Sequence, residues 1–182
     1  MLLELDVLIQ SLPNLAEPGW VRPLPAAGPT VALLRRSGLA VGVLAEQPRA
    51  AHGAVTPRQV EAVRLRVEQL LGPFDVWALC PHAPYDHCGC HHPAPGLVQA
   101  ASRTLALPPG RLVFVGARPG TVAAAEAGGV TGILLTHGPE APPAVPVQHA
   151  PGLWQAAEDA LTVLERRSAL DTTTQGADHD RP

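Results

Sequence analysis

Residues 74–90 read FDVWALCPHAPYDHCGC and join a short apolar run to a cluster of cysteine and histidine side chains. The apolar run, 74–79, predicts a buried strand. It ends at Cys80, and all three cysteines of the chain lie between positions 80 and 90. A cluster of metal-ligating side chains is therefore expected at the carboxyl end of a strand.

The cluster offers three thiolates and one imidazole, a ligand set that suits tetrahedral zinc with no position left for water. The four candidate ligands are Cys80, His82, Cys88 and Cys90. A closed shell of this kind is structural, because the metal orders a loop that has little core of its own. The alternative is a set of buried free cysteines beside surface histidines. A disulfide framework is disfavoured, because three cysteines are an odd number and lie within eleven positions. His87, His91 and His92 could compete as ligands and are expected to face solvent.

Outside this stretch, apolar runs alternate with segments of helical spacing. Further strands are expected at 2–9, 39–44, 112–115 and 132–135, with a short edge strand at 145–148. Helices are expected at 30–37, 56–71, 96–105, 120–127 and 153–166. The second helix has a strong start, with Thr56 as N-cap, Pro57 at its first position and Gln59 completing a capping box. The alternation predicts an α/β fold with a mainly parallel sheet, its first strand central and helices on both faces.

Length and composition limit the organisation and the partners. The 182 residues suit one domain, 1–167, built on aliphatic side chains because only 3% of the chain is aromatic. The tail, 168–182, has little to bury and is expected to be disordered. A net charge of −3 indicates neither nucleic acid nor an anionic membrane as partner. The absence of a basic start and of a long apolar run favours a cytoplasmic protein.

Three segments together resemble a known family. They are the cysteine loop, 80–96, the run VFVG at 113–116, and AAAEAGGV at 123–130. The chain resembles the zinc-containing subfamily of haloacid dehalogenase-like (HAD) phosphatases, which includes histidinol-phosphate and D,D-heptose 1,7-bisphosphate phosphatases. The resemblance extends over most of 1–167. It implies a Rossmann-like three-layer sandwich without a large cap domain, and a structural zinc ion in the loop.

The resemblance also implies a catalytic site, but the chain departs from its first motif. The family uses two aspartates, a nucleophile and a general acid, separated by one residue. The nearest match is LELDVLI at 3–9, in which Glu4 replaces the nucleophile and Asp6 retains the acid. The other register makes Asp6 the nucleophile and puts Leu8 in place of the acid. Neither register restores the pair, and the longer arm of Glu4 disturbs in-line attack.

The second and third motifs also differ. Ala45 stands where a phosphate-contacting hydroxyl is expected, and Glu46 brings negative charge toward an anionic ligand. His92 stands in place of the motif lysine. It is at best partly charged near neutral pH, and all thirteen basic residues of the chain are arginines, so no other lysine can substitute.

The fourth motif, GARPGT at 116–121, contains none of the carboxylates that hold Mg²⁺ in the family, so magnesium is not expected. Arg118, and Gln47 from the second motif, are the candidates for contact with a ligand. These changes predict a catalytically inactive pseudophosphatase that serves as a binding or regulatory module for a phosphorylated ligand or a partner protein. The alternative is an active phosphomonoester hydrolase on a small phosphosugar or a histidinol-phosphate-like substrate. Zinc storage is disfavoured, since a closed shell serves folding.

Overall fold

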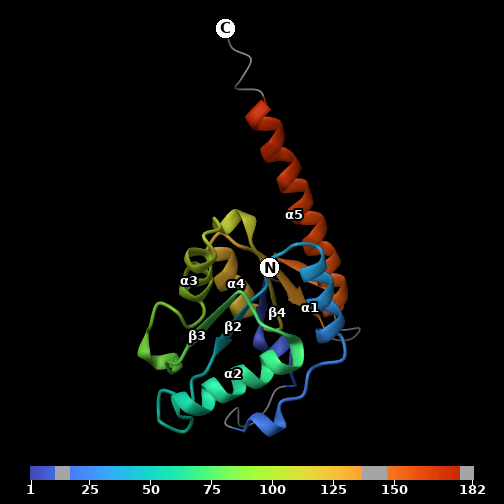
Figure 1. Ribbon diagram of the computed structural model, residues 1–182. Helices are drawn as coiled ribbons and strands as arrows, with labels where there is room; N and C mark the ends of the chain where they lie inside the picture. The colour runs from blue at the N-terminus through green and yellow to red at the C-terminus, as the bar shows by residue number, and fades with distance from the viewer. Residues whose placement is uncertain (11–16, 137–146, 177–182) are drawn as a thin grey trace.

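The computed structural model describes residues 1–10, 17–136 and 147–176, which form a three-layer α/β sandwich (Figure 1). Its centre is a six-stranded sheet in the order β3-β2-β1-β4-β5-β6. The strands are β1 (Leu2–Glu4), β2 (Gly42–Glu46), β3 (Val76–Cys80), β4 (Val113–Gly116), β5 (Thr131–Leu135) and β6 (Gln148–Ala150). Each neighbouring pair is parallel. The predicted parallel sheet with β1 inside it is therefore confirmed.

Both faces of the sheet are covered by helices. These are α1 (Ala27–Arg36), α2 (Pro57–Leu71), α3 (Gly96–Leu105), α4 (Pro119–Ala127) and α5 (Leu153–Gly176). The apolar residues of α1, α2 and α5 form one core with Leu3 and Val43, whereas those of α3 and α4 form a second core with Leu2 and Phe114. Because successive strand residues point to opposite faces, a sheet covered on both sides requires continuous apolar runs. Both cores consist mainly of aliphatic side chains, which agrees with the low aromatic content of the chain.

The predicted start of the second helix is also confirmed. The Thr56 hydroxyl accepts a hydrogen bond from the backbone N–H of Gln59 at 3.3 Å, and the Gln59 side chain accepts one from the backbone N–H of Thr56 at 2.9 Å. Two of the unpaired N–H groups at this helix end are thereby satisfied.

The first strand is shorter than the apolar run that predicted it. After Glu4 the chain leaves the sheet in a 3₁₀ turn, Leu5–Val7, and Ile9 makes an isolated antiparallel bridge with Pro23. Leu5, Val7, Leu8 and Ile9 are nevertheless buried, so their apolar character reflects the core and not the sheet. Periodicity alone does not separate a buried strand from a buried turn.

Two boundaries at the end of the chain differ from expectation. The edge strand occurs at Gln148–Ala150, and the earlier part of the expected segment lies outside the described residues. Helix α5 does not end near 166 but continues to Gly176 and projects beyond the rest of the molecule (Figure 1). No proline or glycine interrupts 153–175, so the first part of the expected disordered tail is drawn into the helix. Residues 177–182 lie outside the described part.

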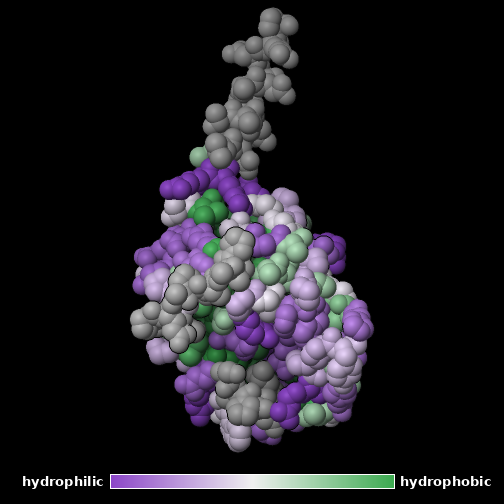
Figure 2. Space-filling view, turned by 180° about the vertical axis from the view of Figure 1, so that it is seen from behind, coloured by the Kyte–Doolittle hydropathy of each residue, from purple (hydrophilic) through white to green (hydrophobic). Residues whose placement is uncertain are grey.

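The surface seen from behind carries small groups of apolar residues among hydrophilic ones (Figure 2). In the part of the chain that the structure describes, no helix combines the length and apolarity that a membrane crossing needs. Among the described residues, no cap domain stands over the carboxyl edge of the sheet. The cysteine loop, which connects β3 to α3, lies there instead.

The first turn of α3 packs tightly on this loop. The backbone N–H of Gly96 donates to the carbonyl oxygen of Gly89 at 2.9 Å, and a Cβ atom added at Gly96 would lie 2.1 Å from that oxygen. Gly96→Ala should therefore lower the free energy of unfolding by about 2 kcal/mol, as overpacking against backbone does. Gly89→Ala is the matched control in the same loop, since its added Cβ meets nothing within 4 Å. Urea denaturation of both variants measures the difference, and equal stability would contradict this packing.

Candidate functional site

The candidate site forms where four parallel strands end at the same edge of the sheet. Glu4 ends β1, Glu46 ends β2, Cys80 ends β3 and Gly116 ends β4. The register places Glu46 directly beside Cys80, which joins the carboxylates to the cysteine loop. Ligand sites of open α/β sheets lie at this edge, outside the carboxyl ends of the strands.

The structure brings the four predicted metal ligands together. The Sγ atom of Cys80 lies 3.7 Å from that of Cys88 and 3.2 Å from that of Cys90, and the last two are 3.5 Å apart. His82 Nδ1 lies 3.2 Å from Cys90 Sγ and 3.7 Å from Cys80 Sγ. A tetrahedron with zinc–sulfur bonds of about 2.3 Å has edges of roughly 3.8 Å. The donor set and its spacing therefore fit a single metal ion.

The three thiols of the cluster differ in acidity. Burial raises the pKa of Cys80 far above its usual value and raises that of Cys90 as well. Burial also acts to raise the pKa of Cys88, but hydrogen bonds from the backbone of Cys90 and His91 outweigh it and lower the pKa to about 7. The backbone N–H of His91 donates to Cys88 Sγ at 3.3 Å. Of the three thiols, that of Cys88 therefore loses its proton at the lowest pH. The thiolate is the form of cysteine that binds a metal.

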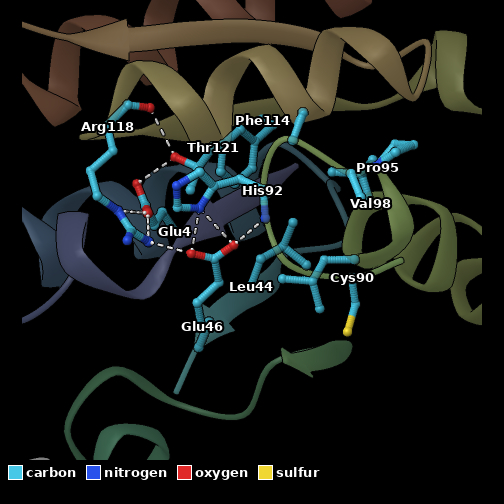
Figure 3. A pocket seen from close by; sticks show the side chains of 14 residues that line it. Glu4, Leu44, Glu46, Cys90, His92, Pro95, Val98, Phe114, Arg118 and Thr121 are labelled. Carbon is cyan, nitrogen blue, oxygen red and sulfur yellow. Dashed lines mark hydrogen bonds and ion pairs between the residues drawn. The ribbon is translucent and has the colours of Figure 1, made fainter. Parts of the chain in front are cut away.

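Arg118 lies among three carboxylates at this edge, and Figure 3 shows two of them, Glu4 and Glu46. Its Nε donates to Glu4 Oε1 at 2.7 Å, and its Nη2 donates to the same oxygen. Nη2 also lies 3.3 Å from Glu46 Oε2, and Nε lies 3.9 Å from Asp6 Oδ2. Burial acts to lower the pKa of Arg118, but the charge of Glu4 and its hydrogen bonds raise it by more. Arg118 is therefore a fixed cation at the carboxyl edge.

Glu4 is buried, with 2% of its surface exposed, and both its oxygens are engaged. Oε1 accepts the two bonds from Arg118, and Oε2 accepts from the backbone N–H of Ala117 at 2.7 Å. The Thr121 hydroxyl lies 3.2 Å from Oε2 but donates its single proton to the closer Arg118 backbone oxygen, at 2.9 Å. Asp6, by contrast, lies in the 3₁₀ turn after β1, and 36% of its side chain is exposed. The two acids of the first motif thus have different environments.

His91 and His92 were expected to face solvent, but the His91 side chain is only 11% exposed and that of His92 only partly exposed, at 31%. His92 Nδ1 lies 2.7 Å from Glu46 Oε2, and the backbone N–H of His92 donates to Glu46 Oε1 at 2.7 Å. His91 Nδ1 lies 3.8 Å from the same Oε1 atom. The cause is the buried carboxylate of Glu46, which draws both residues inward. His87 is exposed, as expected.

The pocket between these groups is small. It is lined by Glu4, Glu46, His92 and Arg118 on its polar side and by Phe114 and Val98 on its apolar side, and it has a volume of about 30 Å³ (Figure 3). Of the two candidate ligand contacts, Arg118 borders the pocket but is bound to carboxylates. Gln47 is buried, and its backbone N–H donates to Cys80 O at 2.7 Å. Sequence reasoning named Glu4, Arg118 and His92 individually but did not identify Arg118 as the partner of Glu4, nor Glu46 as the partner of His92.

The chain was compared with known proteins. No family model matches it. D-glycero-beta-D-manno-heptose-1,7-bisphosphate 7-phosphatase from Pseudomonas putida is 30% identical over 123 residues, which cover 65% of this chain and 70% of the relative. The protein of the same name from Pseudomonas aeruginosa is 28% identical over 123 residues, covering 65% and 68%.

A solved structure agrees with these relatives. D,D-heptose 1,7-bisphosphate phosphatase from B. bronchiseptica, complexed with magnesium and phosphate, superposes with a TM-score of 0.77 at 22% identity. The match covers 89% of this chain and 97% of that one, and at this identity it supports the fold. The sequence relatives, with the cysteine loop and the order of the strands, show that the chain belongs to the HAD superfamily of phosphatases, in its heptose bisphosphate phosphatase-like subfamily.

Proposed function

We propose that this chain is a zinc-stabilised domain of the phosphatase family that lacks the family's magnesium-dependent phosphoryl transfer and serves as a binding or regulatory module. The observation that carries this proposal is the state of Glu4. Its carboxylate is buried and accepts hydrogen bonds from the Arg118 guanidinium at Oε1 and from the backbone N–H of Ala117 at Oε2. An oxygen held in these bonds would have to give them up to attack phosphorus.

The position of Arg118 supports the same proposal. Phosphoryl transfer in this family needs a divalent cation held by carboxylates, and 116–121 contributes none. The described carboxylates nearest to this edge, Glu4, Glu46 and Asp6, instead surround the guanidinium of Arg118. The guanidinium offsets part of their negative charge, above all that of Glu4, and it has no open coordination positions of the kind a metal offers. The residues present therefore do not fit the magnesium site that the family implies.

The second candidate function is an active phosphomonoester hydrolase acting on a small phosphosugar or a histidinol-phosphate-like compound. The comparisons favour this function over the first, because both sequence relatives are named as phosphatases. The related structure from B. bronchiseptica was solved with magnesium and phosphate. In this chain Asp6 would be the residue to carry the chemistry, since it is partly exposed beside Arg118, whereas Glu4 is buried and paired with that arginine.

Phosphate release separates the two functions. We expect the purified protein, with Mg²⁺ present, to release no more phosphate from heptose bisphosphate, histidinol phosphate and other sugar phosphates than its Asp6→Asn variant does. Glu4→Asp should not create activity, because the fourth motif still lacks a carboxylate. Turnover by the wild type that disappears in Asp6→Asn would establish the hydrolase and exclude the inactive module. The variant also controls for a contaminating phosphatase.

Loss of the Arg118 side chain tests the role of this cation in stability. Arg118→Ala leaves the buried Glu4 carboxylate without its charged partner and should lower the free energy of unfolding by roughly 2 kcal/mol. Arg103→Ala, an exposed arginine on α3, is the control and should change stability little. The measurement is urea denaturation. A double-mutant cycle with Glu4→Gln should show that the two losses are not additive.

The cysteine cluster is proposed to hold zinc, on the strength of its donor set and its tetrahedral spacing. The purified protein should retain one tightly held zinc ion per chain after dialysis. Cys88→Ser should lower both the zinc content and the thermal midpoint, because three ligands hold the metal less well and the loop loses its closure. Elemental analysis and thermal unfolding measure these changes. Protein prepared without chelator that contains no zinc would refute the assignment.

A further inference from the structure

We propose a second metal site at the carboxyl edge of the sheet, formed by Glu46, His91 and His92 and suited to a divalent transition metal such as Zn²⁺, Co²⁺ or Ni²⁺. One carboxylate oxygen and one nitrogen from each imidazole lie within 4.8 Å of one another. The site shares no ligand with the cysteine cluster. The site does not depend on whether the chain is a hydrolase, but its test uses the metal binding proposed above for the cysteine cluster.

The distances are close to those of a coordination shell. Nitrogen and oxygen ligands bound at about 2.0–2.2 Å lie roughly 3 Å apart when they are neighbours on one metal. His92 Nδ1 is 2.7 and 2.9 Å from the two Glu46 oxygens, and His91 Nδ1 is 3.8 Å from Oε1. His91 Nδ1 also lies 2.9 Å from the backbone oxygen of His92. If His91 Nδ1 binds the metal, it gives up its contact with the His92 backbone oxygen. The His91 imidazole then moves by less than about 1 Å toward Glu46 Oε1, from 3.8 Å to the spacing of neighbouring ligands.

Burial and charge favour a cation at this point. The Glu46 side chain is only 4% exposed and that of His91 only 11%, and a carboxylate so far from water needs a compensating positive charge. Arg118 approaches Glu46 at 3.3 Å, but its closer hydrogen bonds go to Glu4. Two imidazoles with one carboxylate form a set that prefers transition metals to Mg²⁺, which favours oxygen ligands alone.

The cysteine loop both positions the site and leaves it accessible. The backbone N–H of His91 donates to Cys88 Sγ, and the next backbone N–H, of His92, donates to Glu46 Oε1. The closed loop thus presents two adjacent imidazoles to the buried carboxylate, on the side where Figure 3 shows Glu46 facing His92. A hollow of about 350 Å³ borders the same two imidazoles and is lined as well by His87, Cys88 and Pro93.

Cobalt titration of the metal-depleted protein distinguishes the two sites. Co²⁺ bound by thiolates shows an intense ligand-to-metal charge-transfer band, whereas Co²⁺ bound by imidazole and carboxylate shows only weak d–d bands. We expect the first equivalent to produce the thiolate band and a second equivalent to bind without adding to it. Binding of one equivalent only, with no second event by calorimetry, would overturn the proposal.

Variants assign the second equivalent to its ligands. Glu46→Gln and His91→Ala should each abolish binding of the second equivalent while the thiolate band of the first persists, and that band also shows that the loop is folded. His87→Asn is the matched control, because this exposed histidine of the same loop has a φ of 47°, which asparagine tolerates. It should keep both equivalents. A changed thiolate band in His91→Ala would place His91 in the cysteine cluster, and loss of the second equivalent in His87→Asn would point to other ligands. Either result would refute the assignment.

Discussion

The ion pair between Glu4 and Arg118 is the interaction on which the carboxyl edge of this protein depends. Four strands end there, and the guanidinium of Arg118 faces the carboxylates of Glu4, Asp6 and Glu46. Without that cation, the buried Glu4 would be an uncompensated charge beside the negative Glu46. Arg118 therefore lies where its three neighbouring carboxylates converge, and the stability of this edge depends on the charge of that one side chain.

Local features of the sequence were sufficient to predict the α/β framework and the clustering of the three cysteines with His82. The ligands of the cluster lie within eleven positions, so their spacing and chemistry could be interpreted without a tertiary structure. The capping box of α2 lies within four residues and was predicted in the same way. The parallel sheet with its first strand central followed from the alternation of elements and the handedness of crossovers, whereas the full order of the strands comes from the structure. Such inferences succeed because each depends on neighbours along the chain.

The pairs that define the pocket could not be predicted, because their partners are far apart in sequence. Arg118 contacts Glu4 across 114 positions, and His92 contacts Glu46 across 46. Nothing in the sequence marks Glu46 as the partner of His92, because only the fold brings the two residues together. Likewise, the run after Glu4 is apolar because the turn is buried, which composition does not distinguish from a strand. The cysteine cluster was thus predictable, and its connection to the pocket was not.

The length of α5 has a consequence for how the molecule unfolds. The buried residues of α5 lie near its start; they are Leu153, Ala156, Ala157 and Ala160. Near the middle of the helix, the Arg167 guanidinium donates hydrogen bonds to the Gly110 backbone oxygen and the Thr131 hydroxyl. Beyond this point the helix projects from the body (Figure 1). Short helical segments are marginal in water without tertiary packing. The two halves of α5 therefore belong to different cooperative units, and amide hydrogens of the outer half exchange through local fraying while those of the inner half require opening of the core.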